Sequence, residues 1–331
     1  SVSAYLLKQE GYNVVGVFIK VWQPEGFPCT AKEDRLDPMR VAAQLDIPFL
    51  TLDLEAEYRK GVIDYMLEEY KKGSTPNPDV RCNREVKFGA FLDFAIKHGA
   101  DYIATGHYAQ VKKNGEIYEM HVSKDAEKDQ TYFLWTLNQA QLSHVLFPIG
   151  HLEKKDVRVI AENACLYTAP KKDSQGLCFI GTVSFKDLLK QELNPISGNV
   201  LNEEREIIGT HDGAMLYTLG ERHGFVVTHK TPHDDPFFIV DRDIEKNTIT
   251  VSTKKPQTKP ETEIKLRTLH ATEGIINDSQ VLVRLRYRQT LVRARLIQNK
   301  NNPTLVLEEA SLPVPGQSAV IYNKSGTKVL G

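Results

Sequence analysis

The sequence predicts an α/β protein with a parallel sheet in its first half and mainly short β-strands in its second half. In the first half, β-branched apolar runs alternate with segments that have the apolar spacing of helices, as in parallel sheets covered by helices. From Gly198 onward the chain is rich in Gly, Thr, Val and Ile, and apolar residues alternate with polar ones. This period of two is typical of strands. The length of 331 residues suits two or three domains.

The first half begins with a helix and continues as alternating strands and helices. Strands are predicted at Tyr12–Lys20, Phe49–Leu54 and Ala100–Thr105, and helices at Ser1–Gln9, Asp34–Leu45, Glu55–Lys71, Glu85–His98, Asp129–Ser143 and Lys154–Ala164. Glycines follow several of these helices and favour their ends. Ligands of parallel sheets bind at the carboxyl ends of strands, so residues 18–20 and 105–107 are candidate ligand contacts.

The pattern changes around Asn194-Pro195. Further strands are predicted at Phe237–Val240, Thr248–Ser252, Val281–Arg286, Leu291–Ile297 and Thr304–Leu307. The stretch Thr253–Thr262 is rich in Lys, Pro and Thr, which is typical of a linker. The last segment, of about 65–70 residues, suits a small β-barrel.

Composition and charge limit the possible function classes. With 42 basic and 43 acidic residues the net charge is −1, which argues against a non-specific nucleic-acid binder but allows a local basic face. The apolar runs are too short to span a membrane, and no signal peptide is recognisable. Four cysteines without a C-x-x-C pair argue against a disulfide framework and a zinc site, and favour a reducing cytoplasm.

Cys82 and Cys178 both lie in stretches rich in turn-forming and polar residues. Structural cysteines usually have apolar neighbours, whereas reactive thiols need a polar and partly open setting. If the fold brings the two together, they form a dithiol that can carry or resolve sulfur. We therefore predict that they come within disulfide reach in at least one state.

The segment 75–83 surrounds the first cysteine. Two prolines flank Asn77, and proline disfavours a helix here, so a rigid loop is predicted. A loop that offers Asn77, Asp79 and Cys82 would suit a planar polar ligand such as a nucleobase, with Asp79 able to exchange a proton. An ordinary turn with an incidental cysteine explains the same residues equally well.

The segment 169–181 surrounds the second cysteine. Lys171 and Lys172 precede a turn of Ser, Gln and Gly, and Cys178 follows it. The lysines and the N–H groups of the loop could activate the thiol and hold an anion. A solvated turn, in which Cys178 simply packs, is the alternative.

Two further segments are charged. Lys128-Asp129-Gln130 opens a predicted helix, and a plain helix start is favoured there over a phosphate or base contact. The main basic concentration consists of Arg284, Arg286, Arg288, Arg293 and Arg295. Alternate residues of a strand share a face, so these arginines would form a ribbon for a phosphate backbone or a solvated sheet face.

Ordered motifs along the whole chain resemble those of one known family. They are Thr75–Asp79 followed by Cys82-Asn83, Ala104–Tyr108, Lys128–Gln130, Asp173–Gly181, Arg286–Gln289 and Pro315–Val320. On these motifs the chain resembles the tRNA-specific 2-thiouridylases, which make 2-thiouridine at the wobble position of certain tRNAs.

The resemblance implies three domains. A PP-loop ATP-pyrophosphatase domain would span residues 1–195, a small, mainly β, tRNA-contacting domain 196–262, and a C-terminal β-barrel 263–331. Members of the family carry a Gly-rich phosphate loop just before the first helix. This sequence begins at Ser1, just past that position.

The resemblance also implies roles for individual residues. Cys178 would carry a persulfide, Cys82 would be the nucleophile that completes sulfur release, and Asp79 would be an acid/base. The residues that would contact ATP are Phe18, Ile19 and Gly106. The residues that would contact tRNA or the target base are Asn77, Pro78, Asp79, His107, Lys128, Asp129, Gln130, Arg286, Tyr287 and Gln317.

The implied reaction begins with adenylation of the uridine C2 oxygen by ATP, which Mg²⁺ would accompany. A persulfide on Cys178 would then attack C2 of a base flipped out of the anticodon, and Cys82 would resolve the sulfur linkage. The implied partners are tRNAs of the Glu, Gln and Lys type and a protein sulfur donor, in the cytoplasm and away from any membrane.

Two alternatives remain open. One is another adenylating ligase or amidotransferase of the PP-loop class, for which Cys82 and Cys178 would be dispensable. The other is a tRNA-binding module dominated by the arginine strands. Its binding would depend on salt but not on ATP or on either cysteine.

Overall fold

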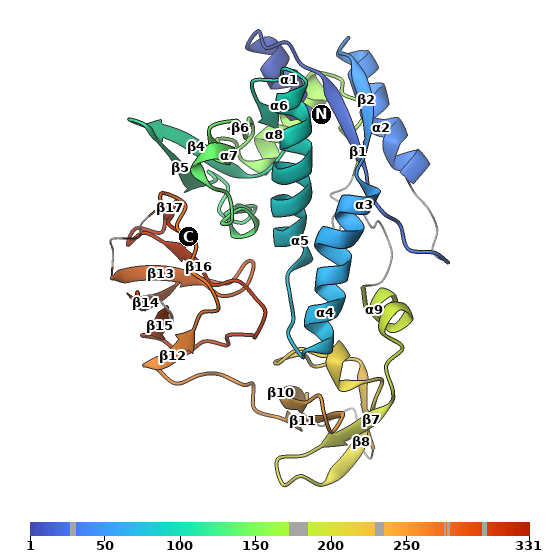
Figure 1. Cartoon of the computed structure of the whole chain (residues 1–331), viewed down its shortest axis with the longest axis vertical. Coiled ribbons are helices and arrows are strands. Elements are labelled where there is room, and N and C mark those ends of the chain that lie inside the picture. Colours follow the sequence, from blue (N-terminus) through green and yellow to red (C-terminus); the bar gives the residue numbers. More distant parts are fainter. Residues whose placement is uncertain (27–30, 172–184, 229–234, 275, 277–278, 300–302) are drawn as a thin grey trace.

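The computed structural model describes residues 1–26, 31–171, 185–228, 235–274, 276, 279–299 and 303–331. In Figure 1 the N-terminal region lies at the top, a mainly β central region at the bottom, and the C-terminal strands at the left. Two long helical runs extend from the N-terminal region toward the central region.

The N-terminal region contains two short parallel sheets. β1 (Gly16–Lys20) pairs with β2 (Phe49–Asp53), and β3 (Ile103–Ala104) pairs with β6 (Val145–Leu146). The helices that flank them are α1 (Val2–Gln9), α2 (Ala31–Gln44) and α8 (Lys154–Asn163). Parallel strands need crossover connections, and the alternation of strands and helices supplies them. The α/β class predicted for the first half is confirmed.

Two long helical runs each change from α-helix to π-helix and back. The runs are α3 (Glu55–Tyr58), η1 (Arg59–Asp64) and α4 (Tyr65–Lys71), and then α5 (Pro78–Arg81), η2 (Cys82–Ala90) and α6 (Phe91–Lys97). The two π-helical segments contact each other. A Cβ atom on Gly61 would come within 3.0 Å of the Cβ atom of Glu85, so glycine permits this close approach. π-Helical turns are rare and frequent at functional sites.

The long helix predicted over Asp129–Ser143 is wrong. The structure has a 3-10 turn, η3 (Thr131–Phe133), and a short helix, α7 (Gln139–Leu142). Tyr132 and Leu134 are both fully buried, so apolar side chains leave this segment in several directions. A helix with one apolar stripe could not bury all of them against a single neighbour.

The central region is a five-stranded sheet in the order β10-β11-β7-β8-β9. Its elements are α9 (Phe185–Leu193), β7 (Gly198–Leu201), β8 (Ile207–His211), η4 (Ala214–Leu216), β9 (Phe225–Val227), β10 (Phe238–Asp243) and β11 (Thr248–Ser252). β11 has the predicted bounds. The stretch that follows it has no regular structure before Thr262, as predicted for the linker.

The C-terminal strands belong to an eight-stranded sheet in the order β12-β15-β14-β13-β16-β17-β5-β4. Its elements are β4 (Ala109–Asn114), β5 (Ile117–Val122), β12 (Thr262–Lys265), β13 (Gln280–Arg284), β14 (Val292–Ile297), β15 (Thr304–Leu307), β16 (Val320–Tyr322) and β17 (Lys328–Val329). The hairpin β4–β5 comes from the N-terminal half and was missed by the sequence reasoning. Because β17 pairs antiparallel with β5, the C-terminal strands continue a sheet that this hairpin begins.

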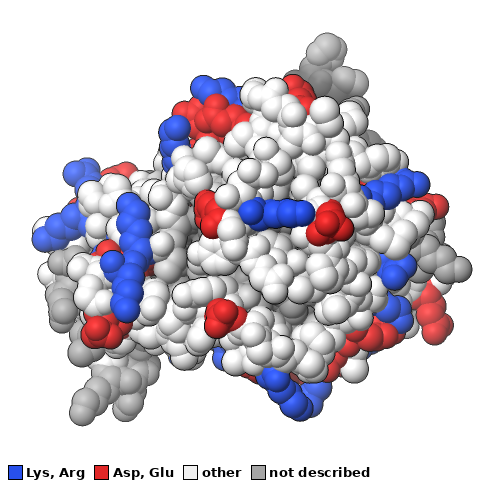
Figure 2. Space-filling view, turned by 90° about the horizontal axis from the view of Figure 1, so that it is seen from above, with Lys and Arg blue, Asp and Glu red and all other residues white. Residues whose placement is uncertain are grey.

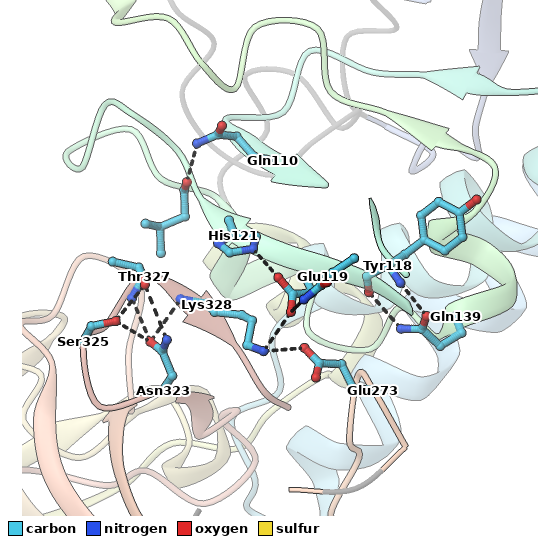
Figure 3. Close-up of polar contacts among 12 residues, drawn as sticks. Gln110, Tyr118, Glu119, His121, Gln139, Glu273, Asn323, Ser325, Thr327 and Lys328 are labelled. Carbon is cyan, nitrogen blue, oxygen red and sulfur yellow. Dashed lines mark hydrogen bonds and ion pairs between the residues drawn. The ribbon is translucent and has the colours of Figure 1, made fainter. Parts of the chain in front are cut away.

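Polar side chains fasten β5 to the C-terminal strands (Figure 3). Lys328 Nζ lies 3.2 Å from a carboxylate oxygen of Glu119 and 3.0 Å from one of Glu273. His121 Nε2 lies 2.9 Å from the other oxygen of Glu119. Hydrogen bonds, first from His121 and then from Asn114, lower the pKa of Glu119 to about 2. Glu119 is therefore ionised at neutral pH and pairs with the Lys328 ammonium group at this joint.

Apolar clusters join the three regions. One contains Tyr58 of the first helical run together with Ile239 of the central sheet. Another contains Tyr132 together with Tyr322 of the C-terminal sheet. Burial of shared apolar surface is the main term that holds such regions together. Among the residues described, no helix combines the length and the apolar character that crossing a bilayer requires.

Candidate active site

Asn77 starts the helix that carries two of the predicted catalytic residues. Its Oδ1 accepts hydrogen bonds from the backbone N–H groups of Asp79 (3.0 Å) and Val80 (3.3 Å). Pro78 occupies the first helical position, where its missing N–H has no intrahelical partner in any case. The prediction that the prolines forbid a helix here is therefore wrong, since this proline initiates one.

Cys82 lies in the second run of helix and is 2% exposed. It belongs to an apolar cluster with Val86, one helical turn further on, and with Tyr58 of the first helical run. The prediction of a polar, partly open setting for this thiol is wrong. The helix started at Pro78 turns position 82 inward, which the polar composition of the segment did not indicate.

Asn83 is a buried polar residue that the sequence reasoning left without a role. Its Nδ2 donates a hydrogen bond of 3.2 Å to the carbonyl oxygen of Phe133. Its Oδ1 is buried and has no hydrogen-bond partner in the described part of the chain. Its position beside Cys82 in the sequence is the signal that could have singled it out.

Thr75 lies two residues before Asn77 and is held by both of the other regions. Its N–H donates to the carbonyl oxygen of Pro315 (2.8 Å), and its carbonyl oxygen accepts from Nε2 of Gln317 (2.7 Å). Its hydroxyl lies 3.2 Å from that of Thr218 in the central region. The side chain of Gln317 is thus placed beside the start of the candidate catalytic helix.

The carboxyl ends of β1 and β3 carry the predicted ATP contacts. Phe18 and Ile19 are both partly buried, and Ile19 packs against the apolar cluster that contains Cys82. Gly106 is exposed, and a Cβ atom there would lie 3.7 Å from Oγ of Ser3. The end of β3 therefore faces the first turn of α1. Within the described ranges, no three His, Cys, Asp or Glu side chains cluster so that they could hold a metal ion.

His107 follows Gly106 and is buried among aromatic rings. Its ring lies 5.8 Å from that of Phe88 on η2 and 5.8 Å from that of Phe147. Nδ1 lies 2.7 Å from the hydroxyl of Thr105. Burial, and to a smaller degree the charge of Lys87, lowers the pKa of His107 well below its ordinary value. The imidazole is therefore neutral at physiological pH.

The Lys128–Gln130 segment is tied into the fold. Asp129 is 3% exposed and forms an ion pair of 2.9 Å with Arg284. The side-chain oxygen of Gln130 accepts from the N–H of Tyr108 (3.0 Å), and the backbone N–H of Gln130 donates to the carbonyl oxygen of Tyr108 (2.9 Å). Both side chains therefore have structural partners, while Lys128 lines a cavity.

This cavity, called the Lys128 cavity below, has a volume of about 500 Å³. Its lining residues are Ala126, Glu127, Lys128, Asp129, Arg284, Arg288, Gln289 and Thr290. Arg284 Nε and Gln289 Oε1 are buried without a hydrogen-bond partner in the described residues. Three cations, Lys128, Arg284 and Arg288, and two carboxylates, Glu127 and Asp129, thus line this cavity.

The remaining arginines are less available than the sequence suggested. Arg286 donates a hydrogen bond of 2.9 Å to the carbonyl oxygen of Leu219, and burial lowers its pKa. Arg293 and Arg295 alternate on the exposed face of β14, as predicted for residues that share a face. Each forms an ion pair with a glutamate. The charges of Arg293 and Arg295 are therefore matched by carboxylates. Figure 2, which views the molecule from the top of Figure 1, shows basic and acidic side chains interspersed on that face.

Several predicted residues meet around two aromatic side chains. The rings of Phe133 and Tyr287 lie 4.4 Å apart, and Phe133 also accepts the hydrogen bond from Asn83. The hydroxyl of Tyr132 donates to Oε1 of Gln317 (3.3 Å). Tyr287 and Gln317 thus lie near the helix of Cys82. Cys178 and the predicted segment 169–181 from residue 172 onward lie outside the described residues.

Two family models match the chain. The model described as tRNA methyl transferase HUP domain matches residues 1–182, and the one described as tRNA methyl transferase PRC-barrel domain matches residues 186–253.

Full-length relatives give a more specific description. The tRNA-specific 2-thiouridylase MnmA of Enterococcus faecalis is 43% identical over 341 residues, covering 100% of this chain and 90% of the relative. The enzyme of the same name from Lysinibacillus sphaericus is 43% identical, covering 98% of this chain and 88% of the relative. That of Alkaliphilus oremlandii is 44% identical, covering 98% and 90%. These relatives are named for thiolation and not for methylation.

Proposed function

The chain belongs to the family of tRNA-specific 2-thiouridylases, and from this premise we propose that it thiolates C2 of a uridine in tRNA. The observation that carries the proposal is the similarity of the whole chain, at 43% identity over 341 residues, to an enzyme of that name. The HUP domain family implies the use of ATP. Methyl transfer is disfavoured because the full-length relatives share another name.

We assign the chemistry to the helix that begins at Pro78. Asn77 and Pro78 stand at its partly buried start and would contact the target base. Asp79, in the first turn, would exchange a proton with the base or with the leaving group. Cys82, one turn further along, would act as the second nucleophile. Its 2% exposure implies that this thiol is uncovered only when its partner arrives.

The sulfur transfer uses two cysteines. ATP supplies the adenylyl group that makes the C2 oxygen of uridine a leaving group. The outer sulfur of a Cys178 persulfide forms a bond to C2, and the bond from C2 to the AMP oxygen breaks. The Cys82 thiolate then attacks Sγ of Cys178, and the electron pair of the broken S–S bond leaves on the sulfur attached to C2. The resulting Cys82–Cys178 disulfide needs a thiol reductant before the next turnover.

The course of the chain supports a meeting of these cysteines. α9 begins at Phe185, seven residues after Cys178. Leu188 and Leu189 of this helix belong to the apolar cluster that also contains Cys82. The chain that follows Cys178 is therefore anchored in the core that surrounds the second nucleophile.

ATP fits the carboxyl ends of β1 and β3. Exposed Gly106 leaves room beside the first turn of α1, and the N-terminus of a helix favours phosphate. Phe18 and Ile19 would contact the nucleotide from β1. Neutral His107 would lie beside it and does not add charge to the site. Mg²⁺ would offset the triphosphate charge.

The Lys128 cavity suits the RNA backbone. Lys128, Arg284 and Arg288 line it, and cationic side chains of this kind bind phosphate oxygens through charge-assisted hydrogen bonds. We assign Arg286 and Tyr287, which follow Arg284 in the sequence, to the same RNA-facing side. Asp129 and Gln130 would act there by holding the cavity wall.

The partners follow from this assignment. We propose the wobble uridine of tRNAs of the Glu, Gln and Lys type as the substrate, because it can leave the anticodon stack and enter a pocket. The persulfide would come from a protein sulfur donor. Thiolate chemistry of this kind requires a reducing compartment. We therefore propose that the reaction takes place in the cytoplasm.

The test is a thiolation assay with the full-length protein, ATP, Mg²⁺, a sulfur donor and an anticodon substrate, read by mass spectrometry of the nucleosides. Cys178→Ser and Cys82→Ser should abolish 2-thiouridine while leaving tRNA binding intact. Cys165→Ser is the matched control, because Cys165 is exposed in the turn after α8. Wild-type formation of 2-thiouridine by Cys178→Ser would overturn the proposal. ATP-dependent activity that survives alkylation of the thiols would favour an adenylating ligase.

A further inference from the structure

The segment that leads into the candidate catalytic helix is held by side chains of the central and the C-terminal regions. It comprises residues 69–75, from the last turn of α4 to the residue before Pro76. Arg267 of the C-terminal region contacts Glu69 (2.6 Å) and the hydroxyl of Ser74 (2.8 Å). Arg242 of the central region donates to the carbonyl oxygens of Gly73 and Tyr217. We call residues 69–75 the lead segment.

The turn at Gly316 presses against the end of the lead segment. Gly316 has a φ of +94°, and a Cβ atom there would lie 2.7 Å from the backbone nitrogen of Thr75. On either side of it, Pro315 accepts from the Thr75 N–H and Gln317 donates to the Thr75 carbonyl oxygen. The turn therefore binds both backbone polar groups of one residue.

Thr75 in turn determines where the helix begins. Only Pro76 separates it from Asn77, and proline leaves little backbone freedom. Pro76 is itself buried. A shift of the Thr75 carbonyl is therefore transmitted to Asn77, whose side chain caps the helix of Asp79 and Cys82.

We propose that Gln317 is a positioning residue, which sets the catalytic helix from the C-terminal region through its hydrogen bond to Thr75. This inference rests on the function proposed above. Both ends of the Gln317 amide are occupied, Nε2 by Thr75 and Oε1 by the hydroxyl of Tyr132. Gln317 thus acts on the base through Thr75 and Asn77.

The test uses Gln317→Glu, which keeps the size of the side chain but places a carboxylate oxygen against the Thr75 carbonyl. Loss of this donor should lower kcat for thiolation about tenfold or more, because misplacement of reacting groups is costly. KM and the Kd for tRNA should stay within about twofold of wild type. Hydrogen exchange over residues 75–83 should be faster in the variant.

Two further variants complete the experiment. Gly316→Ala, which pushes the same turn away from Thr75, should give the same loss of kcat. Arg295→Gln is the matched control, because Arg295 lies on the exposed face of the same region and forms its ion pair with Glu261. If Gln317→Glu instead weakens tRNA binding at unchanged kcat, Gln317 contacts RNA and the inference is overturned. A wild-type protein that makes no 2-thiouridine would refute the proposed function, whereas the exchange measurement still tests the positioning.

Discussion

Asn77 offers a test that separates a structural role from a chemical one. Its Oδ1 is the cap for two backbone N–H groups, those of Asp79 and Val80. Pro78 has no N–H, so these two are the donors that the first turn leaves to be satisfied. Asn77→Ala removes the acceptor for both. Loss of an N-cap of this kind costs about 1 kcal/mol.

The free-energy cost of losing the N-cap can be measured as a change in the rate of hydrogen exchange. A change of about 1.4 kcal/mol is tenfold in an equilibrium constant, so the loss of the cap should open the helix start about fivefold more often. Exchange of the peptide that covers residues 78–83 should be about fivefold faster in Asn77→Ala. A local measurement is needed because unfolding of a chain with several regions is not two-state.

Asn77→Asp is the matched variant. A carboxylate accepts the same two hydrogen bonds and is favoured at a helix N-terminus, so exchange should equal that of wild type. The amide N–H group is lost, however, and 2-thiouridine formation should fall if that group contacts the base. Equal exchange rates in Asn77→Ala and wild type would refute the cap, and full activity of Asn77→Asp would refute the base contact.

Two other predictions concern stability. Asp129→Ala should lower the free energy of unfolding by about 3–5 kcal/mol, because it leaves the charge of Arg284 without its partner in a site where Asp129 is 3% exposed. Thermal unfolding checks this, and an unchanged midpoint temperature would contradict it. Because hydrogen bonds lower the pKa of Glu119 from 4.5 to about 2, its stabilisation is present above pH 4.5 and is lost as the pH falls toward 2. Glu119→Gln should flatten that dependence in melts between pH 5 and 3, and an unaltered pH profile would show that the joint of β5 and β17 does not depend on this carboxylate.

The two strands that the sequence predicted best each have one antiparallel neighbour that is close along the chain. β11 and β15 have the predicted bounds, because a period of two and short connections identify such strands. The hairpin β4–β5 was missed, although Asn114-Gly115 lies at its turn and Asn-Gly is a strong hairpin signal. No local pattern could show that its sheet partner would be β17.

The candidate site was predictable as a set of residue types but not as a geometry. The pattern at residues 75–83 indicated a special backbone, yet it could not distinguish a loop from a helix that begins at Pro78. The burial of Cys82 depends on Tyr58 and Val86, and only the packing of two helices reveals it. The hydrogen bond from Gln317 to Thr75 joins residues that are 242 positions apart in the sequence, which no local sequence pattern can predict.

The shared sheet also affects how the protein is made. β5 ends at Val122, and its partner β17 begins at Lys328. At about 5–20 residues per second, a ribosome takes on the order of 10–40 s to synthesise the chain between them. During this interval the outer edge of β5 is unpaired, and open edges invite association with other chains. The nascent protein thus carries an early-formed hairpin whose docking site is synthesised among the last, and a chaperone that shields Ile117–Val122 would act in that window.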